Sequence, residues 1–491
     1  MTESGLAFGT REAVVPGWPT DRPGYETLAA AVQGEASRWN VPGIAVGLLH
    51  HAHTETAATG ITSIAGGQPV TGDTIFQIGS ISKVFTATLA MRLVDDGLLD
   101  LDEPVLTYVP ALPLADADAR AAVTLRHLFS HTAGFEGDRF TDFGRGDDAL
   151  ARSVASFDTL RQWFAPGELW SYCNAGFYLA GFAIERVCNA PFETVIRERL
   201  FDPLGLKTTV FFAEDAISLP HAIGHRLTSR EAGHAIAHGY SFPRNVNPAG
   251  GIVASTSELL RFAAFHMSDG EIDGTRLLSA SSAKAMREPA IEASDVNTFY
   301  GIGWAIADEE PFRIVGHGGA TRGFRSQLTV VPDRSFAIAI LTNGETGSRA
   351  IQEIESWALA HYLGFERPVP ETIPLGGKKL NAFAGRYERH DGRFTVRRQK
   401  DRLEMTQVSI DEDTSEVESE DVYPLVPVAE RRFRIPDGPG KGGIVNFIDH
   451  EGTDGVTQYL LRFGGRLAER VPEPTTPASG KTGTTKKGKT S

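Results

Sequence analysis

Hydrophobic and polar residues follow two different patterns along the chain. Between about residues 25 and 364, helical periodicity alternates with short apolar runs, and this part ends in a hairpin signal and a helical pattern at 324–364. From residue 380 to 471, short alternating runs are broken by turn residues such as Asp-Gly, which is typical of an antiparallel barrel or sandwich. We therefore predict a large α/β (α+β) domain followed by a small antiparallel β domain.

Three further segments lack this periodicity. Residues 365–379 contain three prolines and two glycines and are typical of a linker. Residues 472–491 are basic and of low complexity, so we expect them to be disordered. Residues 1–24 form an N-terminal extension. The expected order is the extension, a domain at 25–364, the linker, a β domain at 380–471 and the tail.

Composition and charge exclude several classes of function. The 491 residues are 41% hydrophobic and carry a net charge of -14, which disfavours nucleic acid and anionic membranes as partners. No apolar run is long enough to span a membrane, and the first residues lack the basic and apolar regions of a signal peptide. Cys173 and Cys188 are too few for a disulfide framework, so we expect both to be reduced. We predict a cytoplasmic protein.

The stretch "IFQIGSISKVFTATLAMRLVDDG" (75–97) predicts a strand, a polar turn and an apolar helix, with Lys83 in the first helical turn. A cation there faces the positive end of the helix dipole, which is unfavourable unless it has a use. Ser80 lies three residues earlier on the same helical face, so the two side chains can touch. Next to apolar residues the neutral amine is favoured, and it could take the proton of Ser80. Ser80 is therefore a candidate nucleophile and Lys83 its base.

The alternative is that Ser80 and Lys83 are an ordinary cap and a solvated cation. Ser-x-x-Lys is a weak motif, and it occurs again at Ser281 and Lys284. That second copy lies in a polar helical stretch, where a capping serine and a solvated lysine suffice. We interpret the second copy as coincidental.

A second candidate stretch is "PGELWSYCNAGFYLAGFAIERV" (166–187). Asn174 is well placed to cap the apolar helix that follows, and Tyr172 could be a packed aromatic residue. In the functional interpretation, the Tyr172 phenol shares a proton with Lys83 and Ser80, and the Asn174 amide orients the lysine and the substrate. The stretch alone leaves both interpretations open.

A third stretch, "FRIVGHGGATRGFRSQLTVVP" (312–332), combines His317 with Gly318 and Gly319. Two glycines allow a ligand to approach the strand backbone, whose N–H groups could bind an oxyanion. The alternative is an edge strand with a surface histidine. A nucleotide-binding loop is excluded, because no helix follows.

The remaining candidate segments are not predicted to be catalytic or metal-binding sites. "HHAH" (50–53) is predicted to be a hairpin tip. A predicted loop contains four more histidines, namely His221, His225, His234 and His238. Neither group of histidines has the spacing of a metal site. The acidic run 411–421 is interpreted as a solvated loop, and Lys481–Gly483 lies in the predicted disordered tail. We predict no metal.

Taken together, the three stretches resemble the class C β-lactamase-like group of penicillin-recognising serine hydrolases, which includes D-aminopeptidases and β-lactamase-fold esterases. "SISK", "YCN" and "HGG" stand in the family's order, and "PGIAVGLLH", "LRHLFSHTAGF" and "PAGGIVASTSELLRF" resemble its other conserved segments. The resemblance covers about residues 25–362. It implies an antiparallel sheet flanked by helices, with an all-helical subdomain beside it and the active site between them.

The resemblance also implies roles for individual residues. Ser80 would be the nucleophile, Lys83 and Tyr172 would handle its proton, and Asn174 would orient. The backbone N–H groups of Ser80 and Ala320 would form the oxyanion hole, with His317, Gly318 and Gly319 on the opposite wall. No cofactor is implied. His317 replaces the lysine of the penicillin-binding pattern, which weakens a β-lactamase interpretation, and the region 380–471 resembles the lipocalin-like domains of some relatives.

The sequence thus predicts a hydrolase acting on a small-molecule amide, peptide or ester through an acyl-enzyme. Two alternatives stay open. One is a sensor or binding module that is acylated but not turned over, and the other is an acyltransferase. The sequence does not select the substrate or the oligomeric state, because loops around the site decide specificity in this fold.

Overall fold

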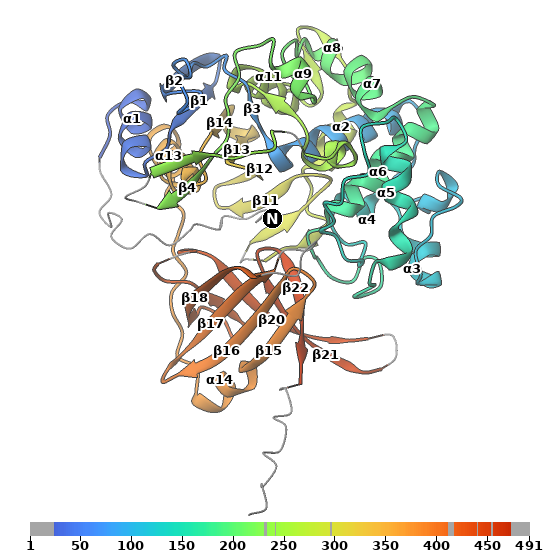
Figure 1. Ribbon diagram of the computed structural model, residues 1–491, viewed down its shortest axis with the longest axis vertical. Coiled ribbons are helices and arrows are strands. Elements are labelled where there is room, and N and C mark those ends of the chain that lie inside the picture. The colour runs from blue at the N-terminus through green and yellow to red at the C-terminus, as the bar shows by residue number, and fades with distance from the viewer. Residues whose placement is uncertain are drawn as a thin grey trace, which may run out of the picture.

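The computed structural model describes residues 24–229, 233–240, 242–294, 297–410, 417–438, 440–452 and 455–472. An α/β body, residues 24–364, lies above a β-barrel in the view of Figure 1. Almost all of the predicted N-terminal extension and of the predicted basic tail falls outside the described residues. The division of the chain into domains stays a prediction.

An eight-stranded antiparallel sheet forms the centre of the body, in the order β2-β1-β14-β13-β12-β11-β10-β9. The strands are β1 (Gly43–His50), β2 (His53–Gly60), β9 (Ile291–Glu292), β10 (Thr298–Tyr300), β11 (Ala305–Glu309), β12 (Phe312–Thr321), β13 (Phe324–Val331) and β14 (Phe336–Thr342). The chain leaves the sheet after β2 and returns at β9, so the long segment between them supplies most of the helices. The predicted hairpin within 324–364 is β13 and β14, and the predicted helix is α13 (Gly347–Leu363).

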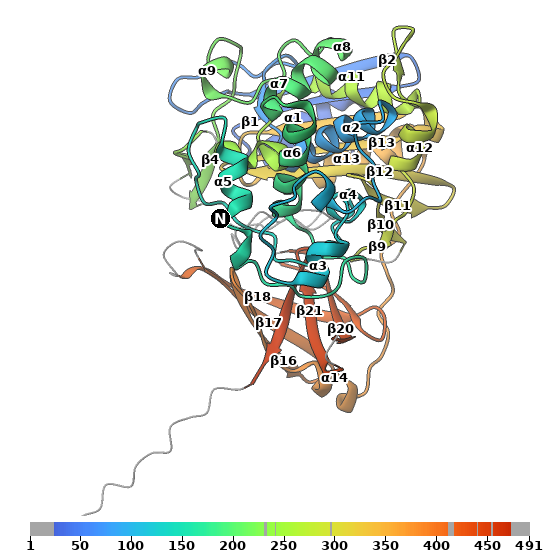
Figure 2. The ribbon, with the colours of Figure 1, turned by 90° about the vertical axis from the view of Figure 1, so that its right-hand side faces the viewer.

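Both faces of the sheet are covered, because side chains of a strand alternate between its two faces. Ile44, Val46 and Leu48 of β1 pack with α1 (Leu28–Arg38) and α13 on one face. Ala45 and residues of β14 at odd positions, such as Leu341, face the opposite core, which contains α2 (Ser82–Asp95) and α11 (Thr256–Met267). The sheet is therefore a buried layer between two layers of helices (Figures 1 and 2).

The segment between β2 and β9 supplies most of the helices, but it also contains three short strand pairs, so it is not the all-helical subdomain that we expected. Its remaining helices are η1 (Gly79–Ile81), η2 (Val105–Thr107), α3 (Ala117–Ala122), α4 (Leu125–Phe129), α5 (Ala149–Ala155), η3 (Phe157–Thr159), α6 (Asn174–Cys188), α7 (Phe192–Ile196), η4 (Arg197–Phe201), α8 (Asp202–Leu204), α9 (Ala213–Ala216), η5 (Arg244–Val246), α10 (Asn247–Gly250) and α12 (Ala280–Met286); η6 (Pro332–Arg334) joins β13 to β14. Short strand pairs also occur, namely β3 (Phe76–Gln77) with β6 (Val253–Ala254), β4 (His225–Ser229) with β5 (Gly233–Ile236), and β7 (Glu271–Ile272) with β8 (Thr275–Arg276). The β4–β5 hairpin shows that the predicted loop containing His225 and His234 was wrong.

The C-terminal part is a closed eight-stranded antiparallel barrel, as the alternating pattern predicted. Its elements are α14 (Gly377–Phe383), β15 (Gly385–Arg389), β16 (Gly392–Gln399), β17 (Arg402–Ile410), β18 (Val417–Pro427), β19 (Arg432–Arg434), β20 (Ile444–Glu451), β21 (Thr457–Phe463) and β22 (Arg466–Val471). Side chains including Phe394, Met405 and Phe447 fill the interior, and α14 adds Leu380. Residues 417–421 of the acidic run belong to β18, so they are not the loop that we predicted.

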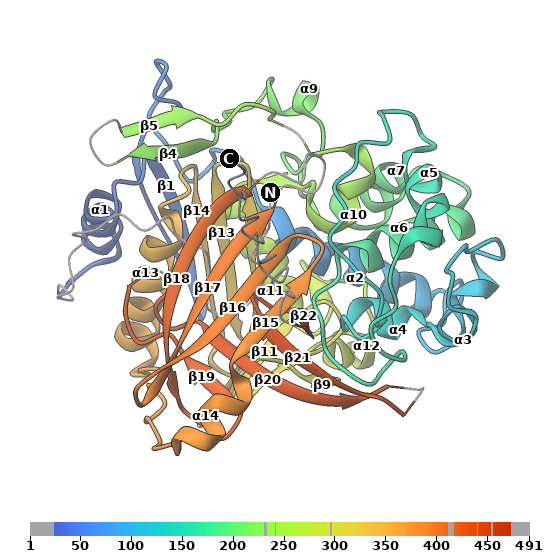
Figure 3. The ribbon, with the colours of Figure 1, turned by 60° about the horizontal axis from the view of Figure 1, so that its bottom comes forward.

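The barrel lies beneath the body in Figures 1 and 2 and in front of it in Figure 3. It contacts the body just after β21, where the carbonyl of Gly465 accepts from the backbone N–H of Tyr172. No helix in the described part of the chain is long and apolar enough to cross a membrane.

Candidate functional site

Ser80 and Lys83 meet at the start of α2, as the helical spacing predicted. Lys83 Nζ lies 3.0 Å from Ser80 Oγ and donates a hydrogen bond to the carbonyl oxygen of Ala249, 2.7 Å away. Both side chains are buried. Ser80 lies in the short 3₁₀ turn η1, and the N-cap of α2 is Ile81, which provides no side-chain cap. The Ser80 hydroxyl is therefore not used as a cap.

The turn that contains Ser80 packs closely against β12. Gly79 has a positive φ of 50°, and a Cβ at this position would lie 2.7 Å from the backbone nitrogen of Ala320. A Cβ on Gly319 would lie 2.0 Å from the carbonyl oxygen of Ile78. Ser326 Oγ donates to the same carbonyl at 2.8 Å. These positions thus require glycine for a physical reason, which is close approach of two backbone segments.

The stretch around His317 forms an inner strand of the sheet, with a local free edge. The pairing of β12 with β11 ends at Gly316, whereas its pairing with β13 continues to Thr321. Residues 317–320 therefore present one backbone edge toward η1 and Ser80. His317 is fully buried, so the alternative of a surface histidine is wrong.

Tyr172, which lies just before α6, is close to Lys83, and Asn174 is the first residue of that helix. Lys83 Nζ is 4.9 Å from the centroid of the Tyr172 ring. The predicted N-cap was wrong by one residue, because α6 begins at Asn174 and the thiol sulfur of Cys173 accepts from the backbone N–H of Gly176. The buried amide of Asn174 is held by Asp138, because its Nδ2 donates to Asp138 Oδ1 at 2.6 Å.

Two buried histidines flank the site in neutral form. Burial, together with the nearby Lys83, lowers the pKa of His317 to about 3. His317 Nδ1 faces the Gly318 carbonyl, so Nε2 is the acceptor for the Tyr300 hydroxyl at 2.9 Å. Burial also lowers the pKa of His131 well below its usual value, and its Nδ1 accepts from the backbone N–H of Cys173. Neither ring adds a positive charge next to Lys83.

The barrel contributes a residue to the site that the sequence did not indicate. Arg466 Nε donates to Asp138 Oδ2 at 2.7 Å, and the carbonyl of Gly465 accepts from the backbone N–H of Tyr172 at 2.9 Å. The guanidinium carbon of Arg466 lies 4.5 Å from the Tyr172 ring centroid. Although burial opposes its charge, the ion pair with Asp138 keeps the pKa of Arg466 above its usual value.

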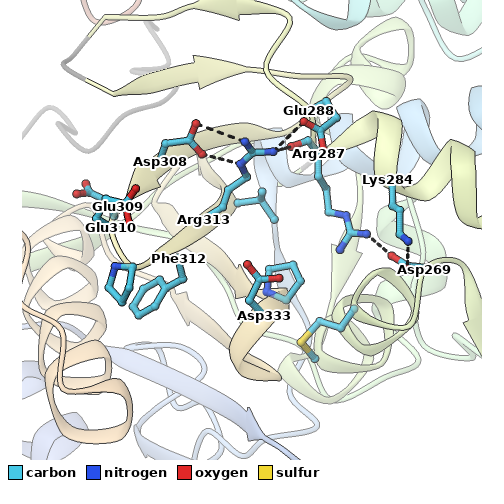
Figure 4. Close-up of a pocket in the computed structure, with 14 residues that line it drawn as sticks. Asp269, Lys284, Arg287, Glu288, Asp308, Glu309, Glu310, Phe312, Arg313 and Asp333 are labelled. Carbon is cyan, nitrogen blue, oxygen red and sulfur yellow. Dashed lines mark hydrogen bonds and ion pairs between the residues drawn. The ribbon is translucent and has the colours of Figure 1, made fainter.

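Several other sequence candidates lie away from this site. Ser281 and Lys284 are in α12, and Lys284 points toward Asp269 at 3.3 Å in a separate, strongly charged pocket (Figure 4). His50, His51 and His53 lie at the tip of the β1–β2 hairpin, as predicted. Cys173 and Cys188 are free thiols, and the described residues contain no cluster of three metal-ligating side chains. Lys481–Gly483 falls outside the described residues.

Buried histidines should make the protein less stable in mild acid. Burial lowers the pKa of His266 to about 3, so the unfolded chain takes up its proton first as the pH falls below 6.5. The stabilisation is complete above that pH and decreases below it, by about 2 kcal/mol at pH 5 for one such histidine. His131 and His317 act in the same direction, whereas Glu185, whose pKa burial raises to about 7, acts in the opposite one.

This expectation is tested by urea unfolding at pH 7.5 and pH 5. The free energy of unfolding should fall in the acid, and His266→Gln should remove about 2 kcal/mol of that fall. A pH dependence that is unchanged in His266→Gln would show that the histidine is not the titrating group.

The family assignment follows from comparison with known proteins. The family model described as Beta-lactamase matches residues 28–362. The chain belongs to the β-lactamase family. The matched segment contains the Ser80 turn, the start of α6 and β12, so the three candidate stretches all lie within the region that the family model matches.

Similar proteins include enzymes and penicillin-binding proteins. Penicillin-binding protein 4 of Amycolatopsis lactamdurans is 35% identical over 360 residues, which are 72% of this chain and 94% of that protein. A D-aminopeptidase of Cereibacter sphaeroides is 25% identical over 360 residues, 70% of this chain and 64% of its own. These homologues are serine hydrolases of the β-lactamase fold, so the prediction of a serine hydrolase is confirmed at the level of the family.

The structural likeness extends into the barrel. The crystal structure of SurE with D-Leu has a TM-score of 0.70 and 26% identity, and the match covers 90% of this chain and 98% of that one. The octameric penicillin-binding protein homologue from Pyrococcus abyssi matches with a TM-score of 0.62 and 22% identity over 90% of this chain and 99% of its own. The second likeness shows the fold alone.

Proposed function

We propose that the protein hydrolyses small amide, peptide or ester bonds through an acyl-enzyme on Ser80. The observation that supports this most directly is the buried pair of Ser80 Oγ and Lys83 Nζ, 3.0 Å apart, at the edge of β12. A nucleophile within hydrogen-bonding reach of a base is the arrangement that covalent catalysis requires. Several relatives in the family carry the names of hydrolases, such as β-lactamase and D-aminopeptidase, which agrees with the proposal.

The reaction begins with a proton transfer. Neutral Lys83 takes the proton of Ser80 Oγ while that oxygen attacks the substrate carbonyl carbon. The negative oxygen that forms is held by the backbone N–H groups of Ser80 and Ala320, which β12 and η1 bring close together. When the intermediate collapses, the bond to the leaving group breaks, and the leaving amine takes the proton from Lys83, with Tyr172 beside it.

The second half of the reaction reverses these roles. A water molecule attacks the acyl carbonyl, gives its proton to Lys83 or Tyr172, and the bond to Ser80 Oγ breaks with return of a proton to the serine. Ala249 holds the lysine in place throughout, because its carbonyl accepts a hydrogen bond from Nζ. Asn174 orients the substrate, and His317 with Gly318 and Gly319 forms the opposite wall. No cofactor takes part in these steps.

Turnover distinguishes this proposal from its alternatives. Purified protein is mixed with p-nitrophenyl acetate or butyrate and with D- and L-amino acid anilides, and product is followed over many enzyme equivalents. A hydrolase gives sustained turnover, with esters faster than anilides, because a phenolate leaves without protonation. Ser80→Ala should abolish the reaction, and Ser281→Ala is the matched control that should retain it.

Two results would contradict the proposal. Release of a single equivalent that then stops, across all substrates, would indicate a sensor that is acylated but not turned over. Slow turnover in water that accelerates with an added amine or alcohol would indicate an acyltransferase.

A further inference from the structure

A cavity of about 520 Å³ lies where β9 of the body faces the barrel, next to the segment that carries Tyr172. We call it the β9–barrel pocket. Its lining residues are Glu168, Leu169, Trp170, Ile291, Glu292, Ala293, Ala429, Glu430, Arg431, Arg432, Asn446, Phe447, Ile448 and Arg462. In Figure 3, β9 lies beside β20 and β21, and hydrogen bonds from Asn446 to Ser294 and from Arg462 to Ala293 connect them.

Almost every charged side chain of this pocket already has a partner. The pairs are Glu168 with His450 (3.4 Å), Glu292 with Arg432 (3.1 Å), Glu430 with Lys379 (2.8 Å), and Arg431 with Asp449. The three glutamates therefore have basic partners. One cation of the lining, Arg462, stays outside these pairs.

Arg462 is the most deeply buried arginine of the pocket. It is 6% exposed, and Nη1 donates to the Ala293 carbonyl at 3.0 Å. Within the described residues, no carboxylate lies within ion-pair distance of its guanidinium, and Nε has no hydrogen-bond partner. Burial lowers its pKa to about 10, although the charge of Glu292 acts in the opposite direction. A buried charge without a counter-ion is unfavourable, which calls for an explanation other than stability.

Trp170 provides a second unused donor next to Arg462. Its ring lies 5.5 Å from the Arg462 guanidinium carbon, and its buried indole Nε1 has no hydrogen-bond partner in the part of the chain that the structure describes. Leu169, Phe447 and Ile448 add apolar surface. The pocket thus combines two unused donors with an apolar wall.

In the charged pocket of Figure 4, every cation of the lining has a carboxylate partner. There, Arg313 pairs with Asp308 and Glu288, and Arg287 and Lys284 pair with Asp269. Each of its cations is neutralised within the pocket. In the β9–barrel pocket, by contrast, Arg462 has no carboxylate within ion-pair distance among the described residues, although the lining as a whole carries as many carboxylates as arginines.

We propose that the β9–barrel pocket binds a carboxylate attached to an apolar group, with the carboxylate on the Arg462 guanidinium. A carboxylate fits because it is planar, singly charged and accepts two parallel hydrogen bonds from a guanidinium. The apolar part would lie on Leu169 and Ile448, which line the pocket and are only partly buried. This site goes beyond the hydrolase proposal, since binding requires no chemistry at Ser80.

Calorimetric titration of the full chain tests the proposal with phenylacetate and N-acetylphenylalanine as probes. Both acids should bind, and phenylacetamide, which has the shape of phenylacetate without the charge, should bind at least about tenfold more weakly. Arg462→Met should weaken binding of the acids by about tenfold or more. Arg287→Met, which breaks a pair in the pocket of Figure 4, is the control that should leave binding unchanged.

Thermal unfolding distinguishes a ligand-binding arginine from a structural one. Without ligand, Arg462→Met should unfold at the temperature of the unaltered protein or above it, because it removes a buried charge that has no counter-ion. Arg389→Met should lower the temperature by several degrees, because it removes the guanidinium that pairs with the buried carboxylate of Asp391. Phenylacetate should raise the unfolding temperature of the unaltered protein and not that of Arg462→Met.

Three results would overturn the proposal: no binding of either acid, equal binding of phenylacetate and phenylacetamide, or acid binding that survives Arg462→Met. Kinetics then identify the source of the carboxylate. If it belongs to a substrate of Ser80, a dipeptide acid should have a lower KM than the dipeptide amide, and phenylacetate should compete with it. If it belongs to a separate ligand, the two KM values should be equal while phenylacetate still binds.

Discussion

Replacing Lys83 by methionine should lower kcat by roughly 10² to 10⁴ while the protein stays folded. Methionine keeps the length and the apolar stem of lysine but cannot accept the proton of Ser80 Oγ, which lies 3.0 Å from Nζ. It also removes the hydrogen bond to the Ala249 carbonyl. The expected change is mainly in kcat, because the base acts in the transition state and not in substrate binding.

Two further variants sharpen this test. Lys83→Arg should not restore activity, because a guanidinium stays protonated and cannot act as a base. Lys284→Met changes the lysine of the second Ser-x-x-Lys copy, whose exposed ion pair with Asp269 is of little energetic weight, and it should leave kcat unchanged. A Lys83→Met protein with nearly full kcat would show that another group deprotonates the serine.

The second large effect is expected when the barrel's ion pair with the site is broken. Asp138 is 2% exposed and accepts from both Arg466 and Asn174, so the barrel arginine fixes the amide of Asn174 through this carboxylate. Arg466→Met leaves a buried carboxylate without its cation, which should lower the free energy of unfolding by about 3–5 kcal/mol. It should also lower kcat/KM, because Asn174 and Tyr172 both lose contacts that hold them.

A double variant separates the structural effect from the effect on the site. Arg466→Met with Asp138→Asn removes both charges, so stability should recover in part. Activity should stay low, because an amide at position 138 can present either its oxygen or its nitrogen to Asn174 and no longer fixes one orientation. Arg389→Met breaks a barrel ion pair of equal burial and should reduce stability without reducing kcat. Recovery of activity together with stability would mean that Arg466 only supports the fold.

The local parts of the site could be predicted from the sequence. Ser80 and Lys83 are three residues apart on a helix, so their contact follows from helical geometry. The strands of the barrel follow from alternating runs, whereas the approach of a ligand to the backbone at Gly318 and Gly319 stays a prediction. In each case the signal lies within a few neighbouring residues.

The rest depends on how distant segments are placed in space. Asp138 and Arg466 are more than three hundred positions apart, and their contact depends on the position of the barrel relative to the body, which no local pattern encodes. Tyr300 of β10 contacts His317 of β12 although β11 lies between these two strands, so this contact also depends on tertiary structure. The wrong cap at Asn174 has a similar cause. The Asn174 amide donates a hydrogen bond to Asp138, and Cys173 is the N-cap residue instead.

Mass spectrometry of the quenched enzyme tests the central claim most directly. The protein is mixed with p-nitrophenyl butyrate, stopped in acid during turnover, digested and searched for the butyryl group. The account predicts the butyryl mass on the peptide that contains Ser80, its absence in Ser80→Ala, and its loss as the substrate is consumed. A butyryl group on another residue, or sustained turnover by Ser80→Ala, would contradict the account.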